Sequence, residues 1–168
     1  MKKLIRAFLC VTLVLTLAAC GGGAGGQTKE APDLNKYYED FMATLGADNT
    51  PAMMDMTEEG SREMIESFFP GLTAYVDGAR QAVVQMAAIN AVAYEFVLLE
   101  LENEQDAAAV GAILQSRVDS QAGGGAFYPE TTAAWEEAQV VVKGTVAALI
   151  VAQGDQARAV EAFNALFA

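Results

Sequence analysis

Cys20 is the residue whose neighbours point most directly to a chemical reaction. It directly follows a short apolar run, Ala7 to Ala19, and that run follows the basic start Met1 to Arg6. A basic start, an apolar stretch and small residues before a cut site are features of an export signal. The run has 13 residues, fewer than the about 20 needed to span a bilayer. The sequence therefore predicts a signal peptide over residues 1–19, with Cys20 at the new amino terminus.

The tetrad Leu17-Ala18-Ala19-Cys20 resembles the lipobox of bacterial lipoproteins. The resemblance implies that the thiol of Cys20 receives a diacylglyceryl group, that the signal is cut before it, and that the new amino group is open to acylation. Two or three acyl chains hold a protein stably on a membrane, whereas one does so only marginally. The alternative is an ordinary secretory signal with an unmodified cysteine, or an uncleaved helix near the membrane.

The chain contains no histidine, and its other cysteine, Cys10, lies in the signal. Ser-His-Asp and Cys-His catalysis and the common imidazole-based zinc and copper sites are thereby excluded. Paired carboxylates for hydrolysis and oxygen ligands for calcium stay open. Glu95 and Glu100, however, lie five residues apart in a predicted strand and so face opposite sides of it. No metal site, cofactor or catalytic residue is predicted.

The charge of the chain is strongly negative, at −12 with 22 acidic and 10 basic residues. Loss of Lys2, Lys3 and Arg6 with the signal would take it to −15. The remaining basic residues are scattered, without the cluster that a phosphate backbone needs. These features argue against nucleic acid as a partner and against flat adsorption onto anionic lipid.

The segment Gly123 to Glu130 is the most unusual local sequence after the signal. Its three glycines allow backbone torsions that other residues avoid, and Phe127 and Tyr128 can present stacking surface to a glycan or a peptide. With Trp135 they form the predicted contact surface. The alternative is structural, with glycine ending a helix and the aromatics plugging the open edge of a sheet. Met53-Met54-Asp55-Met56 is interpreted as core or a flexible apolar patch rather than a copper(I) site.

Residues 20–32 are rich in glycine and are predicted to form a flexible tether with a reach of roughly 20 Å. Residues 33–168 suffice for one domain with one core. Their hydrophobic spacing predicts an α+β fold of two N-terminal helices followed by a ββαββα unit. The predicted architecture is a four-stranded, mainly antiparallel sheet with helices packed on one face.

Capping residues and breakers set the expected boundaries. Asp33 caps the first helix, which Gly46 stops, and Thr57 starts the second, which Phe69-Pro70-Gly71 ends. The strands are expected near residues 82–88, 92–101, 138–143 and 145–152, the third helix from Asn103 through Gln121, and the last helix after a cap at Asp155. The strand over 92–101 is apolar on both faces and so interior to the sheet, with Leu99 in the core. Arg117 and Asp119 are expected on the outside of the third helix.

Five landmarks carry a resemblance: Phe68-Phe69-Pro70-Gly71-Leu72, the strand region Ala88 to Leu101, the segment Gly123 to Glu130, Trp135, and the hairpin Gln139 to Gly144. Together they resemble bacterial lipoproteins of one family, domain of unknown function 4358, over Pro51 to Ala168. The family is typical of Gram-positive bacteria, which implies anchoring to the outer leaflet of a single membrane. It has no established activity, so the resemblance adds no catalytic residue.

Taken together, the sequence favours a membrane-anchored envelope lipoprotein that acts as a noncatalytic binding or assembly module. We expect a monomer whose partner is an envelope protein, a peptide or a cell-wall glycan. The alternative is a carboxylate-dependent cell-wall hydrolase or another extracytoplasmic enzyme. Such an enzyme would need distant acids brought together by folding.

Overall fold

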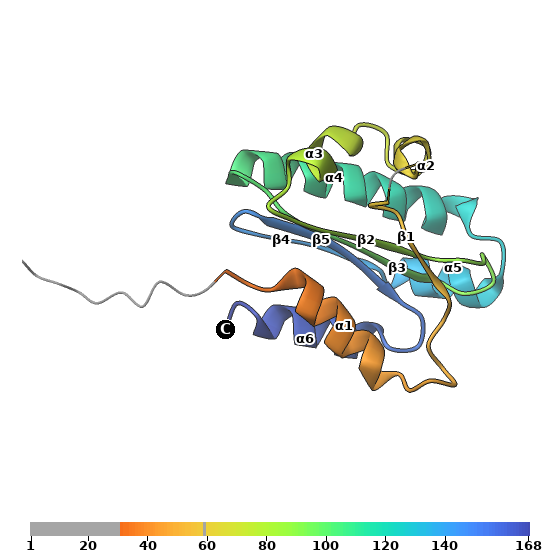
Figure 1. The fold of residues 1–168 in the computed structure, drawn as a ribbon. Coiled ribbons are helices and arrows are strands. Elements are labelled where there is room, and N and C mark those ends of the chain that lie inside the picture. Colours follow the sequence, from red (N-terminus) through yellow and green to blue (C-terminus); the bar gives the residue numbers. More distant parts are fainter. Residues whose placement is uncertain (1–30, 59) are drawn as a thin grey trace, which may run out of the picture. The chain divides into compact units, whose positions relative to one another are not determined.

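An antiparallel sheet with the strand order β1-β2-β3-β5-β4 organises residues 31–168, which form one unit (Figure 1). The computed structural model describes residues 31–58 and 60–168, so the predicted signal peptide, Cys20 and the tether as far as Glu30 lie outside the described residues. The strands are Met53–Asp55 (β1), Gln81–Ala87 (β2), Tyr94–Glu100 (β3), Gln139–Lys143 (β4) and Val146–Ala152 (β5). The predicted α+β class is confirmed.

Six α-helices accompany the sheet in the described ranges. They are Leu34–Thr44 (α1), Arg62–Phe68 (α2), Thr73–Gly78 (α3), Glu104–Ser120 (α4), Pro129–Glu136 (α5) and Gln156–Ala165 (α6). A short π-helical turn, Gln121–Gly125 (η1), follows α4 directly. Asp33 caps α1 as predicted, because its carboxylate accepts a hydrogen bond from the amide of Lys36 at 2.8 Å.

The helices cover both faces of the sheet, and the prediction that they pack on one face is wrong. Phe96 and Leu98 of β3 lie in a core formed with α1 and α6, whereas Val97 and Leu99 lie in a core formed with α2, α4 and α5. Figure 1 shows α1 and α6 on one side of the strands and α2, α3 and α4 on the other. A strand that is apolar on both faces requires a layer over each of them.

The first half of the chain contains a strand that the sequence did not indicate. Met53 and Met54 pair with the end of β2, which makes the sheet five-stranded rather than four-stranded. The helix expected to start at Thr57 begins at Arg62 instead. Thr57 lies in a turn, where its amide and hydroxyl donate to Asp55 Oδ1 at 2.8 and 2.6 Å. An Asx-type turn of this kind competes with helix initiation.

Two helix starts in the second half depart from expectation in different ways. No helix was expected between Gln121 and the strand near 138–143, yet residues 129–136 form α5. This helix begins with a proline at its first turn, where the missing amide is tolerated. Asp155 precedes α6 as predicted, yet its side chain does not cap the helix. It accepts from Arg158 and from the hydroxyl of Tyr94 instead. The cap predicted for α4 is confirmed, since Asn103 accepts from the amide of Asp106 at 2.9 Å.

The described chain enters this unit at one particular end of the sheet. The carbonyl of Pro32, the last residue of the predicted tether, accepts a hydrogen bond from Gln81 Nε2 at 2.9 Å. Gln81 begins β2 and pairs with Glu100, the last residue of β3. The far end of both strands therefore lies about 20 Å away, at about 3.3 Å per residue.

Candidate functional site

A cavity of about 320 Å³ opens at this far end, where β2 ends and β3 begins. Its lining comes from β1, β2 and β3 of the sheet, from the loop between β2 and β3, and from α2, the end of α4, η1 and α5. Its lining is mainly apolar and includes Met54, Met64, Phe68, Met86, Ile89, Val92, Phe127 and Trp135. A concave apolar site with a few convergent polar groups is the usual form of a binding pocket.

An ion pair between Glu95 and Arg117 is the charged part of the lining that the structure describes. Arg117 Nε donates to Glu95 Oε1 at 3.1 Å, and Nη2 donates to Oε2 at 2.9 Å. The side chains are only 4% (Glu95) and 11% (Arg117) exposed. Glu95 belongs to β3 and Arg117 to the last turn of α4, where the helix dipole favours a cation. The expectation that Arg117 lies on the outside of its helix is wrong.

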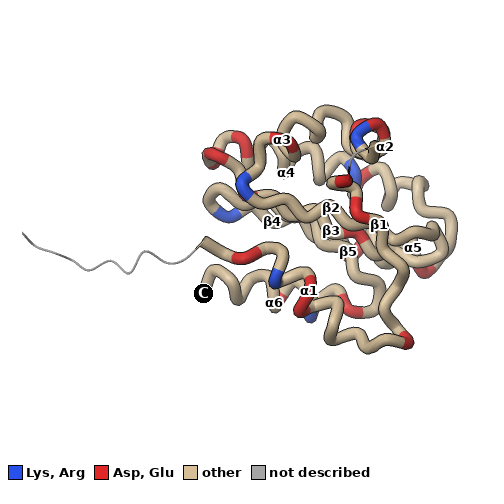
Figure 2. The backbone as a smooth tube through the Cα atoms, viewed as in Figure 1, with Lys and Arg blue, Asp and Glu red and all other residues tan. Residues whose placement is uncertain are grey.

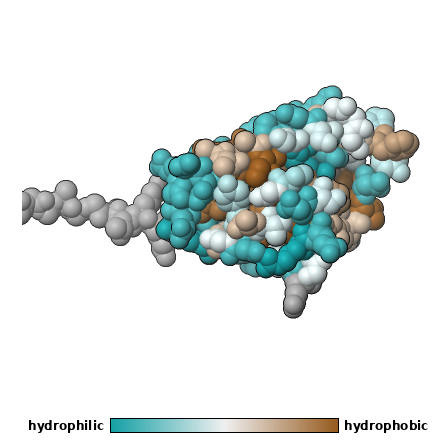
Figure 3. Space-filling view, turned by 90° about the horizontal axis from the view of Figure 1, so that it is seen from above, coloured by the Kyte–Doolittle hydropathy of each residue, from teal (hydrophilic) through white to brown (hydrophobic). Residues whose placement is uncertain are grey.

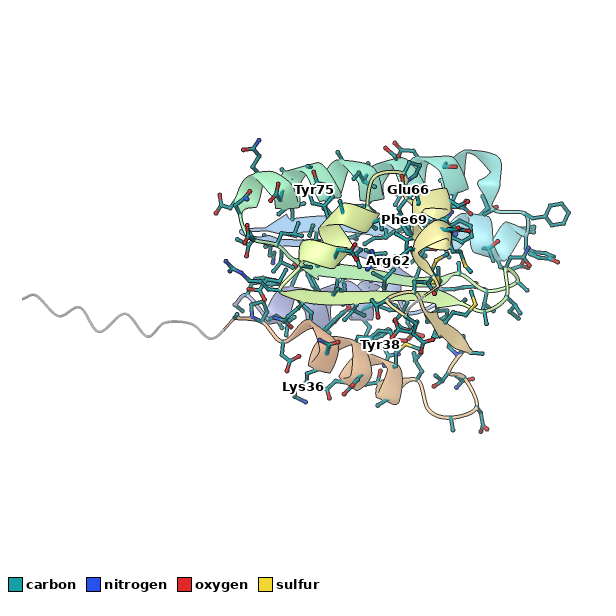
Figure 4. The ribbon with its side chains drawn as sticks, turned by 45° about the horizontal axis from the view of Figure 1, so that its top comes forward. Lys36, Tyr38, Arg62, Glu66, Phe69 and Tyr75 are labelled. Carbon is teal, nitrogen blue, oxygen red and sulfur yellow. The ribbon has the colours of Figure 1, made fainter. Side chains whose placement is uncertain are left out.

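Aromatic rings surround the guanidinium of Arg117. Its central carbon lies 4.9 Å from the ring centroid of Phe68, 5.5 Å from that of Phe69 and 5.2 Å from that of Trp135. Figure 4 labels Phe69 at the end of α2. Desolvated cation–π contacts of this kind contribute about 2 kcal/mol or more. They explain how a basic side chain can lie in an apolar layer, because the rings replace part of its lost hydration.

The carboxylate of Glu95 is held in an environment that disfavours its charge. Burial raises the pKa of Glu95 above its ordinary value, while the hydrogen bonds and the positive charge of Arg117 act in the opposite direction. A buried ion pair contributes little net stability compared with apolar residues of the same size. Perturbed ionisable groups in a cavity are more frequent at functional sites than elsewhere.

Exposed apolar side chains gather at the mouth of the pocket. In the part of the chain that the structure describes, seven large apolar side chains are more than a third exposed, and five of them line this cavity: Met54, Met64, Phe68, Ile89 and Phe127. Figure 3 shows hydrophobic surface at its right-hand end, the end where α5 lies in Figure 1. Clustered apolar exposure marks interaction sites, whereas scattered exposure does not.

The three glycines before Phe127 have a local structural role in placing it. Gly124 has φ of 120°, which other residues rarely adopt. At Gly125 a Cβ atom would lie 2.8 Å from the carbonyl oxygen of Ser120 and 2.7 Å from Gln121 Nε2. The glycines therefore allow the chain to turn sharply out of α4 and return as α5. Phe127 lies in the connection between the two.

The structure separates the three aromatic residues of the predicted contact surface. Phe127 is 84% exposed and Trp135 is 5% exposed, and both line the pocket. Tyr128 is 41% exposed and contacts the ring of Phe127 edge-to-face at 5.2 Å, but it does not line the cavity. The structural alternative, in which the aromatics plug the edge of the sheet, is wrong for Phe127. Trp135 is buried, so it is not part of the exposed surface. It lines the pocket and contacts the guanidinium of Arg117.

Sequence reasoning missed the ion pair, although one signal for it was present. Glu95 shares a strand face with Val97 and Leu99, and a charged residue at a core position of an interior strand needs a buried partner. Glu100 lies on the opposite face, as predicted, where its Oε2 accepts from Gln81 Nε2 at 2.6 Å. Within residues 31–58 and 60–168, no group of three or more acidic, histidine or cysteine side chains is placed to hold a metal ion.

Comparisons with known proteins do not identify the site. The chain matches no protein-family model, and neither a curated protein nor a solved structure is significantly similar to it. Its similarity to domain of unknown function 4358 stays a prediction from the sequence. None of the described helices is both long and apolar enough to cross a membrane.

Proposed function

We propose that this protein is a lipid-anchored component of the bacterial cell envelope that binds a partner without catalysis, and that the pocket between β3, α2 and α5 is its binding site. The observation that carries the proposal is the gathering of five exposed apolar side chains around one cavity with a buried Glu95–Arg117 pair in its lining. Water-exposed apolar surface of this extent lowers solubility unless a partner covers it.

The carboxylates near the pocket favour binding over hydrolysis. Glycoside hydrolysis in its usual form needs two carboxyl groups about 5–10 Å apart. Glu95 is the carboxylate in the described lining, and both of its oxygens accept hydrogen bonds from Arg117. Glu100 lies on the other face of the sheet and contacts Gln81. The lining formed by the described residues therefore lacks the second acid of a hydrolase pair.

The position of the pocket agrees with attachment through Cys20. The predicted tether joins the domain at Pro32, beside the start of β2, whereas the pocket includes Met86 and Ala87 at the end of β2. A pocket at the end of the sheet away from the attachment point is accessible to molecules outside the membrane. We propose the outer leaflet of a Gram-positive membrane as the location, on the family resemblance, with the domain as a monomer.

Site-specific photocrosslinking in intact cells tests the binding role. A photoreactive phenylalanine analogue is placed at Ile89 or Phe127 on the rim, and at Val142, an exposed apolar residue of β4 outside the pocket. We expect the two rim positions to capture the same species and Val142 not to capture it. Capture that is equal at all three positions, or absent from the rim, would count against the pocket as the binding site.

Mass spectrometry of the amino-terminal peptide of the protein isolated from its own cells tests the anchor separately. We expect a peptide that begins at Cys20 and carries acyl chains. An unmodified Cys20 in that peptide would contradict the lipid anchor and leave the pocket untouched.

A further inference from the structure

The apolar rim of the pocket is wider than a small molecule would cover. The cavity of about 320 Å³ lies at the lower end of the about 300–1,000 Å³ that small-molecule sites span. Phe127 and Ile89 are 84% and 61% exposed at its rim. A ligand that only filled the cavity would leave most of these two side chains in water. The occupant therefore has apolar surface that continues beyond the pocket, as a protein segment does.

The interior of the pocket selects an uncharged group. The charges of Glu95 and Arg117 are paired with each other, and the rest of the described lining is neutral. An ionised group placed there would lose its hydration without gaining a free counter-ion. A sugar would find few hydrogen-bond partners for its hydroxyl groups, chiefly Asn90, Gln121 and Thr131, among methionine, aromatic and aliphatic side chains. A large apolar or aromatic side chain matches this lining best.

The surroundings of the pocket are acidic. Exposed carboxylates adjoin lining residues in two of the helices: Glu63 precedes Met64 in α2, and Glu130 precedes Thr131 in α5. Figure 2 shows acidic residues spread over the helices and loops, and the chain as a whole carries a charge of −12. Such a field attracts basic segments and repels acidic ones. A second copy of this chain, with the same negative charge, is disfavoured as the occupant.

We propose that the pocket takes one large uncharged side chain from an extended segment of another envelope protein, and that this segment carries lysine or arginine beside that side chain. The inference rests on the proposed binding function and adds the chemistry of the partner. The buried apolar anchor supplies most of the affinity, as at other interfaces. The basic flanks speed association and set specificity.

Selection from a random library of displayed peptides tests the partner chemistry without knowledge of the partner. The chain as isolated from cells is reconstituted into phosphatidylcholine nanodiscs, whose zwitterionic lipid does not itself attract basic peptides, and empty nanodiscs remove background binders. We expect the selected sequences to share one tryptophan, phenylalanine, leucine or methionine with lysine or arginine on either side. Sequences with acidic flanks, sequences without a large uncharged residue, or no enrichment over empty nanodiscs would each overturn the proposal.

The best selected peptide is then measured against matched variants. We expect the double change Ile89→Ala and Phe127→Ala to raise Kd at least tenfold. Val142→Ala, a truncation at an exposed apolar residue outside the pocket, should leave Kd within twofold. Raising the salt concentration from about 50 to 500 mM should weaken binding severalfold, because it screens the basic flanks. Equal binding by the rim variant and the native chain would contradict the pocket as the peptide site.

Two outcomes separate the partner chemistry from the binding function itself. N-acetyltryptophanamide that binds as tightly as the selected peptides would overturn the protein-segment claim while supporting the pocket as a ligand site. Rim-specific photocrosslinks in cells, combined with a selection that enriches nothing, would retain the binding function and reject the apolar-anchor chemistry. Both proposals fail if capture in cells is not specific to the rim positions and if no selected peptide binds the native chain more tightly than the rim variant.

Discussion

The two faces of the sheet differ in how completely their helices cover them. On the face of α1 and α6, Tyr37 packs edge-to-face on Phe163 with centroids 5.3 Å apart, and its hydroxyl donates to the carbonyl of Ala159 at 2.8 Å. Phe41 and Phe96 add a further ring contact at 5.5 Å. On the other face, the helices leave a cavity over the ends of β2 and β3, and a charged pair lies beneath it.

This difference indicates that the two cores differ in how closely they are packed. The α1 and α6 face has the features of a stable core: its rings are closely packed, and its buried hydroxyl is hydrogen-bonded. The pocket face is less closely packed, because it contains a cavity, and some of its methionine and phenylalanine side chains are exposed to water. Proteins commonly lose some stability where they place a functional site. Substitutions on the two faces should therefore affect stability and binding in opposite proportions.

Leu99→Asp should have the largest effect on stability, because it places a charge in β3, the strand that contributes side chains to both cores. Leu99 is fully buried in β3, and an unpaired carboxylate there costs several kcal/mol against a total stability of about 5–15 kcal/mol. We expect the variant to be unfolded at 25 °C by circular dichroism. A cooperative melting transition at the native temperature would show that Leu99 is not in the core.

Phe163→Ala tests the α1 and α6 face. Phe163 is fully buried and contacts the rings of Tyr37 and Phe167. Truncation of a buried phenylalanine to alanine costs about 3–5 kcal/mol. Urea unfolding should show a loss of this size, while the remaining folded protein should retain its rim-specific photocrosslink. Loss of the crosslink in cells at a temperature where the purified variant is folded would mean that the two faces are coupled.

Arg117→Met tests the buried pair on the pocket face. It leaves the carboxylate of Glu95 buried without a partner, which costs about 3–5 kcal/mol, whereas Glu95→Gln together with Arg117→Met should be close to neutral. The single variant Glu95→Gln completes the cycle, and urea unfolding of the native chain, the two single variants and the double variant gives the coupling energy. A double variant as unstable as Arg117→Met alone would mean that packing of the guanidinium against the three rings, rather than charge pairing, holds this layer together.

The helices α1, α4 and α6 and the β4–β5 hairpin followed from local patterns, whereas α3 and α5 were not predicted and the sheet followed less completely. Ala107, Val110, Leu114 and Val118 have the spacing of one helical face, and they form the buried side of α4. Lys143-Gly144 is typical of a tight turn, and it lies where β4 turns into β5. By contrast, β1 has three residues and exists because it pairs with the end of β2. Nothing in Met53-Met54-Asp55 alone specifies that pairing, since a strand of this length depends on its neighbour.

The candidate site was predictable only where one segment was unusual by itself. The three glycines and Phe127 drew attention because of their composition, and Trp135 because of its type. Glu95 and Arg117 meet because the last turn of α4 lies over β3, a tertiary relation that the amphipathic stripe of α4 leaves open. The stripe places Arg117 at the boundary of the buried side, and the rings of Phe68 and Trp135 then enclose it.

The pH dependence of stability reports the environment of Glu95. Because burial raises its pKa above 4.5, the folded state holds this proton to a higher pH than the unfolded state does. Between the two pKa values the folded state binds more protons, so the contribution of Glu95 to the unfolding free energy falls as pH rises and is largest below 4.5.

The double variant that lacks both charges serves as the reference for this dependence. The unfolding free energy of the native chain minus that of the variant should decrease from pH 4.5 upward and level off above the folded pKa. Urea unfolding at steps of half a pH unit measures it. A difference that increases with pH would mean that Arg117 has lowered the pKa of Glu95 instead.

Phe127→Ala should have the smallest effect on stability and the clearest effect on binding. Phe127 is 84% exposed, so its truncation should change the unfolding free energy by no more than about 0.5 kcal/mol, as is usual at the surface. The same change removes apolar area from the rim, and capture from a photoreactive residue at Ile89 should fall severalfold. Val142→Ala is the matched control, because Val142 is also exposed and lies outside the pocket. If Phe127→Ala destabilises the fold but leaves capture intact, the side chain contributes to packing. The expectation that substitutions on the pocket face affect binding more than stability would then be wrong for its most exposed residue.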